Sequence, residues 1–284
     1  MISAKTKLFC VIGDPIEHSM SPVMHNTVFK KMGLDCVYTA FRIKKQNLGD
    51  AISGMKAMGI QGVNITIPHK VSVMDHLDEL SDEARIIGAV NTVKIGEKLM
   101  GFNTDGVGAL RALRNGGADP EDKNVLILGS GGAARAIAVT LALQGGVSSL
   151  TILGVIEDEL KKLADDISTG TDVAAVDRLM DDDVLKEEVE KADLLIHCTP
   201  VGMHPDVEKS LVPPELLRSD LNVMDIVYNP RETKLIKDAK KAGALTVEGI
   251  NMFVNQGAES LRIWLGIDAP VGLMKDVVLK ELNL

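Results

Sequence analysis

The sequence predicts an α/β protein of two domains, each built around a mostly parallel β-sheet. Short apolar runs rich in Val and Ile alternate with helical patterns along most of the chain, which is typical of βαβ units. One of these runs leads into a glycine-rich loop and then a helix, as in dinucleotide-binding units. The length of 284 residues suits two domains, each with a core of its own.

The first elements follow from local signals. Residues 21–32 predict a helix, because Ser21 and Pro22 supply an N-cap and a favoured first position, and Gly33 ends the helix. Residues 89–104 predict a β-hairpin around a Gly-Glu turn. The strands are expected at the apolar runs near residues 7–13, 36–43, 62–67, 124–129, 149–153, 172–176, 193–199, 222–228 and 245–248.

The domain boundaries follow from the same pattern. The hairpin closes a first α/β domain near Asp105, and a second sheet begins after the polar stretch 115–124. Two helices, at residues 251–266 and 271–283, follow the last strand, and we expect them to pack back on the first domain. We therefore expect one domain at residues 1–105 plus 250–284 and a second at 106–249, with a cleft.

Composition restricts the class of partner. The net charge is −9, and no run of Lys or Arg occurs, which disfavours a nucleic-acid or anionic membrane surface and favours a small-molecule ligand. Cys10, Cys36 and Cys198 are few, distant and odd in number, so we expect reduced thiols and a cytoplasmic protein. The apolar run at the N-terminus is too short for a signal peptide or membrane span.

The glycine-rich loop GSGGAA follows the apolar run NVLIL and opens a helix. Its first glycine allows a tight turn, its second lets the backbone approach a pyrophosphate, and its last alanine allows close helix packing. The helix N-terminus offers N–H groups to the phosphates. The alternative is a turn that only connects strand to helix. The predicted cofactor-binding residues here are Gly129, Ser130, Gly131, Gly132, Ala133 and Ala134.

The second strand of this unit ends in Gly154, Val155 and Ile156, followed by three acidic residues at 157–159. No Arg stands where a 2′-phosphate needs one, and the nearest bases are at 161–162. The carboxylates either favour an unphosphorylated ribose or stabilise the first turn of the next helix.

Lys70 and Asp105 are the candidate catalytic pair. Lys70 follows Pro68 at the end of a strand and opens a helical stretch, where an ammonium is electrostatically disfavoured. Asp105 also opens a helix, so an N-cap role is an even alternative. An opposed ammonium and carboxylate can hold a hydroxyl and relay its proton while hydride leaves the same carbon.

Two hydroxyls, Ser19 and Ser21, stand at a helix N-terminus, which can receive a carboxylate. The alternative is that Ser21 only caps the helix and Ser19 is solvated. The histidines show no metal-ligand spacing, so we expect no metal site. For the histidines at 197 and 204 we expect structural or solvent-facing roles.

Taken together, the segments resemble the shikimate dehydrogenase family over nearly the whole chain. The matching segments, in order, are GDPIEHSMSPVMHN, NITIPHK, GAVNT, GFNTDG, GSGGAARA, CTPVGM and NMFVNQGA. The resemblance implies reversible NADP-dependent reduction of 3-dehydroshikimate to shikimate, a step of chorismate and aromatic amino-acid biosynthesis. It also implies an N-terminal substrate domain and a Rossmann domain.

The resemblance assigns roles to single residues. It implies that Ser19 and Ser21 hold the substrate carboxylate and that Lys70 carries the proton. The residues implied to hold ring hydroxyls are Asn64, Thr66, Asn91 and Asp105. Further substrate contacts are implied for Tyr228 and Gln256. Ile226 and Gly249 are implied to lie beside the nicotinamide. Thr199, in the CTPVGM segment, is also a predicted cofactor-binding residue.

The chain departs from the family where an Asn-Arg-Thr segment usually binds the 2′-phosphate and the sequence here reads Gly154-Val155-Ile156. NAD or dual use is therefore an alternative to NADP. A quinate dehydrogenase, or a dehydrogenase that uses both quinate and shikimate, is an alternative activity. A sensor that binds dinucleotide or metabolite without catalysis is an alternative to an enzyme. We expect a monomer or a homodimer.

Overall fold

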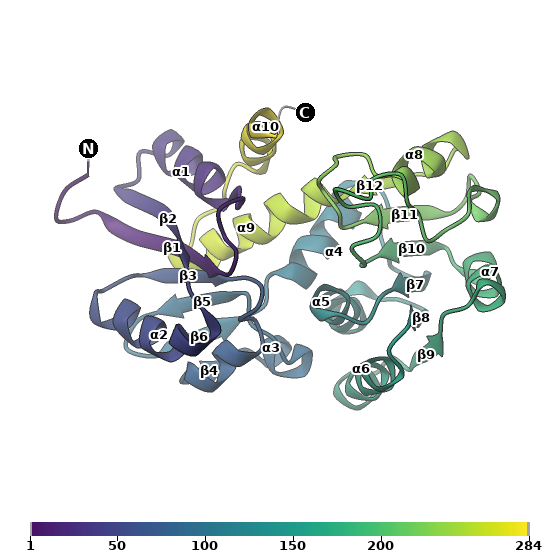
Figure 1. Ribbon diagram of the computed structural model, residues 1–284, viewed down its shortest axis with the longest axis horizontal. Coiled ribbons are helices and arrows are strands. Elements are labelled where there is room, and N and C mark those ends of the chain that lie inside the picture. Colours follow the sequence, from purple (N-terminus) through teal and green to yellow (C-terminus); the bar gives the residue numbers. More distant parts are fainter. Residues whose placement is uncertain (1, 283–284) are drawn as a thin grey trace. The chain divides into compact units, whose positions relative to one another are not determined.

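The computed structural model describes residues 2–282 and divides the chain into two compact units. Unit 1 comprises Met1–Thr104 and Gln256–Leu284, and unit 2 comprises Asp105–Asn255. Unit 1 is therefore assembled from both ends of the chain, with unit 2 inserted between them in sequence (Figure 1).

Unit 1 contains a six-stranded sheet of order β2-β1-β3-β5-β6-β4. β1 pairs in parallel with β2 and β3, whereas the hairpin β5–β6 adds to β3 in antiparallel fashion. The strands are β1 (Lys7–Gly13), β2 (Cys36–Arg42), β3 (Gly62–Ile65), β4 (Glu79–Leu80), β5 (Thr92–Ile95) and β6 (Leu99–Phe102). The helices are α1 (Ser21–Lys31), α2 (Leu48–Ala57), α3 (Asp82–Ile87) and α10 (Val271–Glu281), with 3₁₀ turns at Lys45–Asn47 and Ser72–His76.

Alternating side chains on β1 serve the two faces of this sheet. Phe9 stacks on Trp264 of α9 (Gly249–Leu265) at a centroid distance of 5.1 Å. Cys10 and Ile12 point to the opposite face and pack in one buried cluster with residues of α2. The Trp264 indole also donates a hydrogen bond to the Val93 carbonyl at 3.0 Å. The helices that follow the last strand thus pack back on unit 1, as predicted.

Unit 2 contains a fully parallel sheet of order β12-β11-β10-β7-β8-β9, which is the doubly wound order of a Rossmann domain. The strands are β7 (Asn124–Leu128), β8 (Ser149–Gly154), β9 (Ala175–Leu179), β10 (Leu194–His197), β11 (Asn222–Asp225) and β12 (Thr246–Glu248). The helices are α4 (Asp105–Asn115), α5 (Gly132–Thr140), α6 (Glu157–Gly170), α7 (Asp182–Lys191) and α8 (Lys234–Lys241), with a π turn at Leu141–Gly145 and a 3₁₀ turn at Pro214–Leu216.

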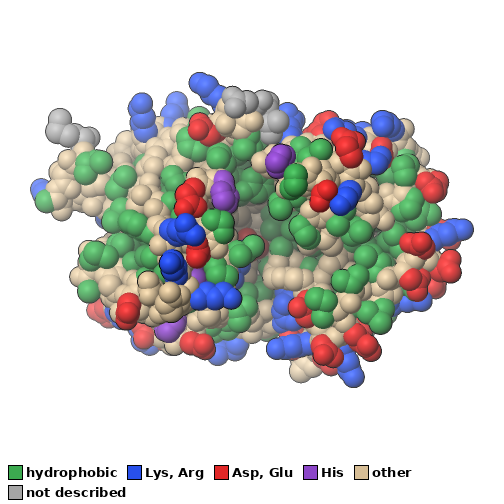
Figure 2. Space-filling view, in the orientation of Figure 1, with side chains coloured by type: hydrophobic (Ala, Val, Ile, Leu, Met, Phe, Trp, Pro, Cys, Tyr) green, Lys and Arg blue, Asp and Glu red, His purple; other side chains and the backbone are tan. Residues whose placement is uncertain are grey.

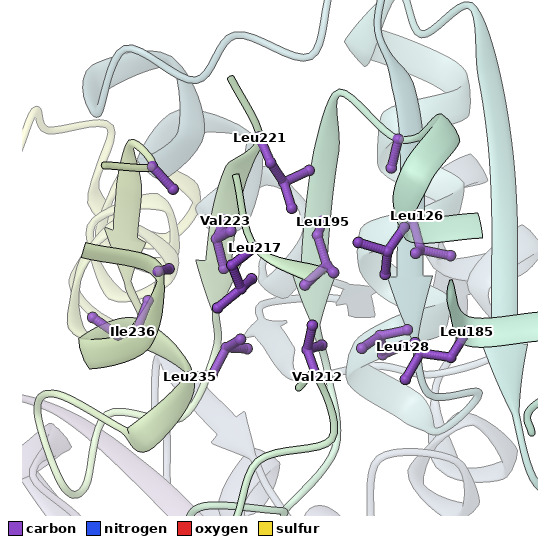
Figure 3. Packing of buried hydrophobic residues seen from close by; sticks show 14 of the residues in the cluster. Leu126, Leu128, Leu185, Leu195, Val212, Leu217, Leu221, Val223, Leu235 and Ile236 are labelled. Atoms are coloured by element: carbon purple, nitrogen blue, oxygen red, sulfur yellow. The ribbon is translucent and has the colours of Figure 1, made fainter. Parts of the chain in front are cut away.

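Close packing on one face of this sheet forms the core shown in Figure 3. This buried cluster includes Leu126 and Leu128 of β7, Leu185 of α7, Val223 of β11 and Leu235 of α8. Burial of aliphatic side chains on both faces explains why the strands read as continuous apolar runs.

Some local predictions were wrong. The strand predicted at 172–176 runs from Ala175 to Leu179, because the polar start of that segment lies in a bend. Ser21 is the first residue of α1, and Met20 occupies the N-cap without a side-chain bond. The short β4 was not predicted. Residue 283, at the expected end of the last helix, lies outside the described residues.

Charge on the visible face is mixed, with red and blue side chains interspersed (Figure 2). Among residues 2–282, no helix is both long and apolar enough to cross a bilayer.

Candidate functional site

The polar residues of unit 1 meet where β3 and β6 end and β5 begins. Asn64 of β3 lies opposite Thr92 of β5 in the antiparallel register, and the two side chains are 8% and 0% exposed. Buried polar groups need partners. The Asn64 amide nitrogen therefore faces acceptors on Thr92 and on Ser260 of α9, each at 3.0 Å.

Asn91 and Thr104 form the second part of this polar cluster. The Asn91 side-chain oxygen accepts the Thr104 backbone N–H at 2.8 Å and the Thr92 hydroxyl at 3.0 Å. Its amide nitrogen donates to the Thr104 hydroxyl at 3.0 Å. The segments GAVNT and GFNT thus lock together, and the side chain of Asn91 is 3% exposed.

Helix α9 completes the cluster from the other end of the sequence. Gln256, half-buried, brings its side-chain oxygen to 3.4 Å from the Thr104 hydroxyl. Ser260 is fully buried and bonds both Thr92 and the Gln256 carbonyl. The structure therefore brings together three predicted substrate residues, namely Asn64, Asn91 and Gln256.

Tyr38 of β2 joins the predicted serine to the same cluster. Its hydroxyl donates to Asn64 Oδ1 at 2.7 Å and also interacts with the Ser21 side chain. Burial raises the pKa of Tyr38 well above its ordinary value, so this phenol stays protonated and acts as a donor. Ser19 is half-buried and accepts the Ser21 backbone N–H at 3.3 Å. Both serines and Asn64 therefore belong to one network.

Lys70 lies in the turn after β3 and is half-buried. Its carbonyl accepts the Val90 N–H at 2.8 Å, which ties this turn to the segment that leads into Asn91. The expected helical stretch is a short 3₁₀ turn that begins at Ser72, two residues later. Thr66, at the other end of this turn, is half-buried, and its backbone N–H donates to the Ile12 carbonyl at 3.0 Å.

Asp105 is the first residue of α4 and belongs to unit 2. It follows Thr104 directly in the chain and is 7% exposed. A carboxylate in the first turn of a helix is stabilised by the helix dipole.

The glycine-rich loop of unit 2 has the geometry predicted for it. Gly129 has φ +113°, and a Cβ there would lie 3.2 Å from the Cys198 carbonyl oxygen, so only glycine fits. Gly131 is the N-cap of α5, without a capping side chain, and a Cβ on Gly131 or Gly132 would meet open space. Ala134 is fully buried, Ala133 half-buried, and Ser130 8% exposed. An open helix N-terminus of this kind fits a pyrophosphate.

Thr199, the predicted cofactor residue after β10, is fixed by a buried network. Its hydroxyl lies 2.6 Å from His197 Nε2, and His197 Nδ1 lies 2.9 Å from Asp225 Oδ1. Asp225 also accepts the Thr233 hydroxyl at 2.6 Å and the Val227 N–H at 3.0 Å. The network sets the turn that packs against Gly129.

The remaining predicted residues of unit 2 lie after β11. A Cβ on Gly249 would lie 2.4 Å from the Ile226 carbonyl oxygen, so this glycine permits a close backbone approach. Tyr228 stacks on Phe253 with centroids 4.9 Å apart. Burial raises the pKa of Tyr228.

Sequence reasoning missed several members of these networks, namely Tyr38, Thr92, Thr104, Ser260 and Asp225. The threonines stand beside Asn91 and Asp105 inside the quoted segments, which was an available signal. Tyr38 and Ser260 lie within apolar patterns, where nothing in the sequence marks a polar partner far along the chain.

Comparison with known protein families covers most of the chain. Residues 11–93 match the shikimate dehydrogenase substrate binding domain, and residues 249–279 match the shikimate 5′-dehydrogenase C-terminal domain. Residues 125–247 match the saccharopine dehydrogenase NADP binding domain.

Full-length relatives carry the same name. The shikimate dehydrogenase (NADP(+)) of Methanocaldococcus jannaschii is 42% identical, with 100% of both chains covered. A crystal structure of a shikimate dehydrogenase in complex with NADP+ superposes with a TM-score of 0.89 at 42% identity, covering 99% of this chain and 98% of the other. The shikimate 5-dehydrogenase from Listeria monocytogenes, in complex with shikimate and NAD, gives 0.93 at 37% identity, with 98% of each chain covered.

A structure with a different name is also similar. Quinate dehydrogenase from Corynebacterium glutamicum, in complex with NAD, gives a TM-score of 0.90 at 29% identity, covering 97% of this chain and 99% of that one.

Proposed function

Because this chain belongs to the shikimate dehydrogenase family, we propose that it catalyses the reversible NADP-dependent reduction of 3-dehydroshikimate to shikimate. The observation that carries the proposal is the buried amide and hydroxyl cluster around Asn64, Asn91 and Thr104. Such a cluster presents directional donors and acceptors to a ring that bears several hydroxyls. The protein is accordingly an NAD(P)-dependent oxidoreductase that acts on a CH–OH group.

Each unit has one task in this proposal. Unit 1, corresponding to the domain expected at 1–105 plus 250–284, binds the substrate, and unit 2, corresponding to 106–249, binds the dinucleotide. The open helix N-terminus after Gly131 holds the pyrophosphate, with Gly129, Ser130, Gly132, Ala133 and Ala134 forming the turn. Thr199 also contacts the dinucleotide, and Ile226 and Gly249 lie beside the nicotinamide.

The substrate groups are assigned by chemistry. Ser19 and Ser21, with two hydroxyls at the start of α1, receive the carboxylate. Tyr228 and Gln256 make further contacts. The amide, hydroxyl and carboxylate groups that bind ring hydroxyls are those of Asn64, Thr66, Asn91 and Asp105.

The mechanism needs a hydride and a proton. The bound dinucleotide supplies or accepts the hydride. In the direction of reduction, Lys70 gives its proton to the oxygen that becomes the C3 hydroxyl, which prevents charge from accumulating there. Asp105 orients the neighbouring C4 hydroxyl and supports the lysine. In oxidation, the same lysine, deprotonated, takes the hydroxyl proton.

The test is the oxidation of shikimate by the purified protein with NADP, followed by the near-ultraviolet absorbance of the reduced nicotinamide. Turnover at a kcat within the usual enzyme range of about 1–1,000 per second is expected. If the protein binds NADP and shikimate without any absorbance change, it is a metabolite sensor and the proposed activity is wrong.

Quinate is the second candidate substrate, because a quinate dehydrogenase shares the fold at a TM-score of 0.90. Quinate differs from shikimate mainly by a tertiary hydroxyl beside the carboxylate, so the discriminating contacts lie near Ser19 and Ser21. Values of kcat/KM for both substrates decide this point, and a clear preference for quinate would overturn the shikimate assignment.

A further inference from the structure

The adenosine end of the dinucleotide site carries carboxylates where a 2′-phosphate needs a cation. In Rossmann domains the ribose lies beyond the end of the second strand, where a carboxylate binds the 2′-hydroxyl or an Arg accommodates the 2′-phosphate. In unit 2 this strand is β8, which ends at Gly154. The next two residues, Val155 and Ile156, are 73% and 50% exposed and bear no charge.

The arginines nearest in sequence are committed to other partners. The chain has no Arg between Arg135 and Arg178. Arg135 of α5 pairs with Asp166 of α6 at 2.5 Å. Arg178 pairs with two glutamates of α7, at 2.8 and 2.5 Å, and these pairings raise its pKa. Neither guanidinium is therefore positioned as a ready partner for a phosphate after β8.

Glu159 occupies the edge of the site instead. It lies in the first turn of α6, and the Ser130 hydroxyl of the glycine-rich loop donates to its Oε2 at 3.0 Å. The same hydroxyl lies 3.5 Å from the position of a Cβ on Gly154. The carboxylate of Glu159 is thus fastened between the pyrophosphate turn and the end of β8, where the ribose belongs.

Electrostatics at this position favour a hydroxyl over a phosphate. The first turn of α6 already contains three acidic residues, which neutralise the positive end of the helix dipole that could otherwise hold an anion. A phosphate monoester carries a charge of about −1.5 to −2 and meets like charge there. A ribose 2′-hydroxyl can instead donate to a carboxylate. The nearby cations, Lys161 and Lys162, have exposed, flexible side chains and follow Glu159 by two and three residues.

We propose that Glu159, held by Ser130, is a specificity-determining residue that lets this protein use NAD and weakens its grip on the 2′-phosphate of NADP. The inference deepens the proposed function and rests on it, since the same dinucleotide site is involved. The residues of the loop fit the pyrophosphate shared by both cofactors; only the 2′-phosphate lacks its usual partner.

The test compares dissociation constants for NAD+ and NADP+ by titration calorimetry, a readout independent of turnover. For the unaltered protein, the two values should lie within about tenfold of each other. Glu159→Gln keeps an acceptor for Ser130 but removes the charge, and should shift the ratio toward NADP by on the order of tenfold. Val155→Arg, which supplies a guanidinium, should shift it by about 10- to 100-fold.

Asp165→Asn is the matched control, because Asp165 is an exposed carboxylate on the same helix but more than one turn beyond Glu159. Its ratio should equal that of the unaltered protein. NADP bound more than about tenfold tighter than NAD by the unaltered protein, or an unchanged ratio in Glu159→Gln, would overturn this inference.

The proposed function is judged separately in the same experiment by adding shikimate. If shikimate is oxidised with NADP but not with NAD, the proposed function is supported and the cofactor inference is refuted. Binding of both dinucleotides at the expected ratio without oxidation supports the cofactor inference and refutes the activity.

Discussion

Lys70 is the residue on which the proposed proton transfer depends. Replacing it with alanine removes the general acid, so kcat should fall by about two to four orders of magnitude with a modest change in KM. Steady-state kinetics with shikimate and NADP measure both constants. Lys94→Ala is the control, since Lys94 is an exposed lysine on β5 of the same unit. Unchanged turnover in Lys70→Ala would remove this lysine from the mechanism.

His25 makes the stability of unit 1 depend on pH. Its ring is fully buried and stacks on Tyr38 at 4.4 Å, and neither ring nitrogen has a hydrogen-bond partner among the described residues. Burial therefore lowers its pKa from 6.5 to about 3. The neutral ring is compatible with the fold, whereas the unfolded chain takes up a proton below about pH 6.5.

The direction in which stability changes with pH follows from this difference in pKa between the folded and unfolded chain. The stability contributed by the depressed pKa is present above pH 6.5 and is lost as the pH falls from 6.5 toward 3. Between pH 7 and pH 5 the free energy of unfolding should drop by about 2 kcal/mol through this residue. Urea unfolding of unit 1 at the two pH values should show the drop in the unaltered protein and in a His204→Gln control, which changes an exposed histidine. His25→Phe should lack it; an equal drop in that variant would refute the assignment.

Helices α4 and α5 approach each other so closely that one glycine decides their packing. A Cβ on Gly106 would lie 1.9 Å from the Thr140 hydroxyl and 2.3 Å from the Ala136 carbonyl oxygen. Because α5 carries the glycine-rich loop at its N-terminus, a shift of α5 also moves the cofactor site.

Gly106→Ala should therefore destabilise unit 2 by about 1–3 kcal/mol through overpacking and weaken dinucleotide binding. Denaturant unfolding and calorimetry measure the two effects. Gly54→Ala in α2, where a Cβ meets open space, should instead stabilise the helix by up to about 1 kcal/mol. If Gly106→Ala is as well tolerated as Gly54→Ala, the close contact is not what fixes α5.

At the scale of elements, the sequence predicted what periodicity and turn chemistry control. The apolar runs, the hairpin and the glycine-rich loop predict strands and helices that the structure contains. The two-residue strand β4 is too short to produce a pattern, and β9 is displaced because its partly exposed segment lacks a clear apolar run.

The candidate site was predictable only in part, for a physical reason. Asn64, Asn91 and Lys70 stand at strand ends, where sequence patterns place functional side chains. Their partners Tyr38 and Ser260 are selected by three-dimensional packing, which no local pattern reports. The acidic run at 157–159 is visible in the sequence, but the hydrogen bond from Ser130 to Glu159 is not. A helix and a strand separate these two residues along the chain.

For the molecule as a whole, each of the two units has its own hydrophobic core. NADP at about 100 times its dissociation constant should stabilise the unit that binds it by about 2.7 kcal/mol. Amide hydrogen exchange should show protection in β7 and the loop 129–134 of unit 2 on adding NADP. Adding shikimate should protect the segments around Asn64 and Asn91 in unit 1. The reverse assignment of the two ligands would contradict the proposed division of tasks.

The discontinuity of unit 1 has a consequence for biosynthesis. Ser260 and Trp264 bond to groups of β3 and β5, yet they are translated after all of unit 2. On the ribosome, the inserted unit can complete its sheet while the first hundred residues still lack the helix that covers Phe9 and the polar amides. Domains usually finish in the order in which they are made; in this chain the domain that starts first finishes last.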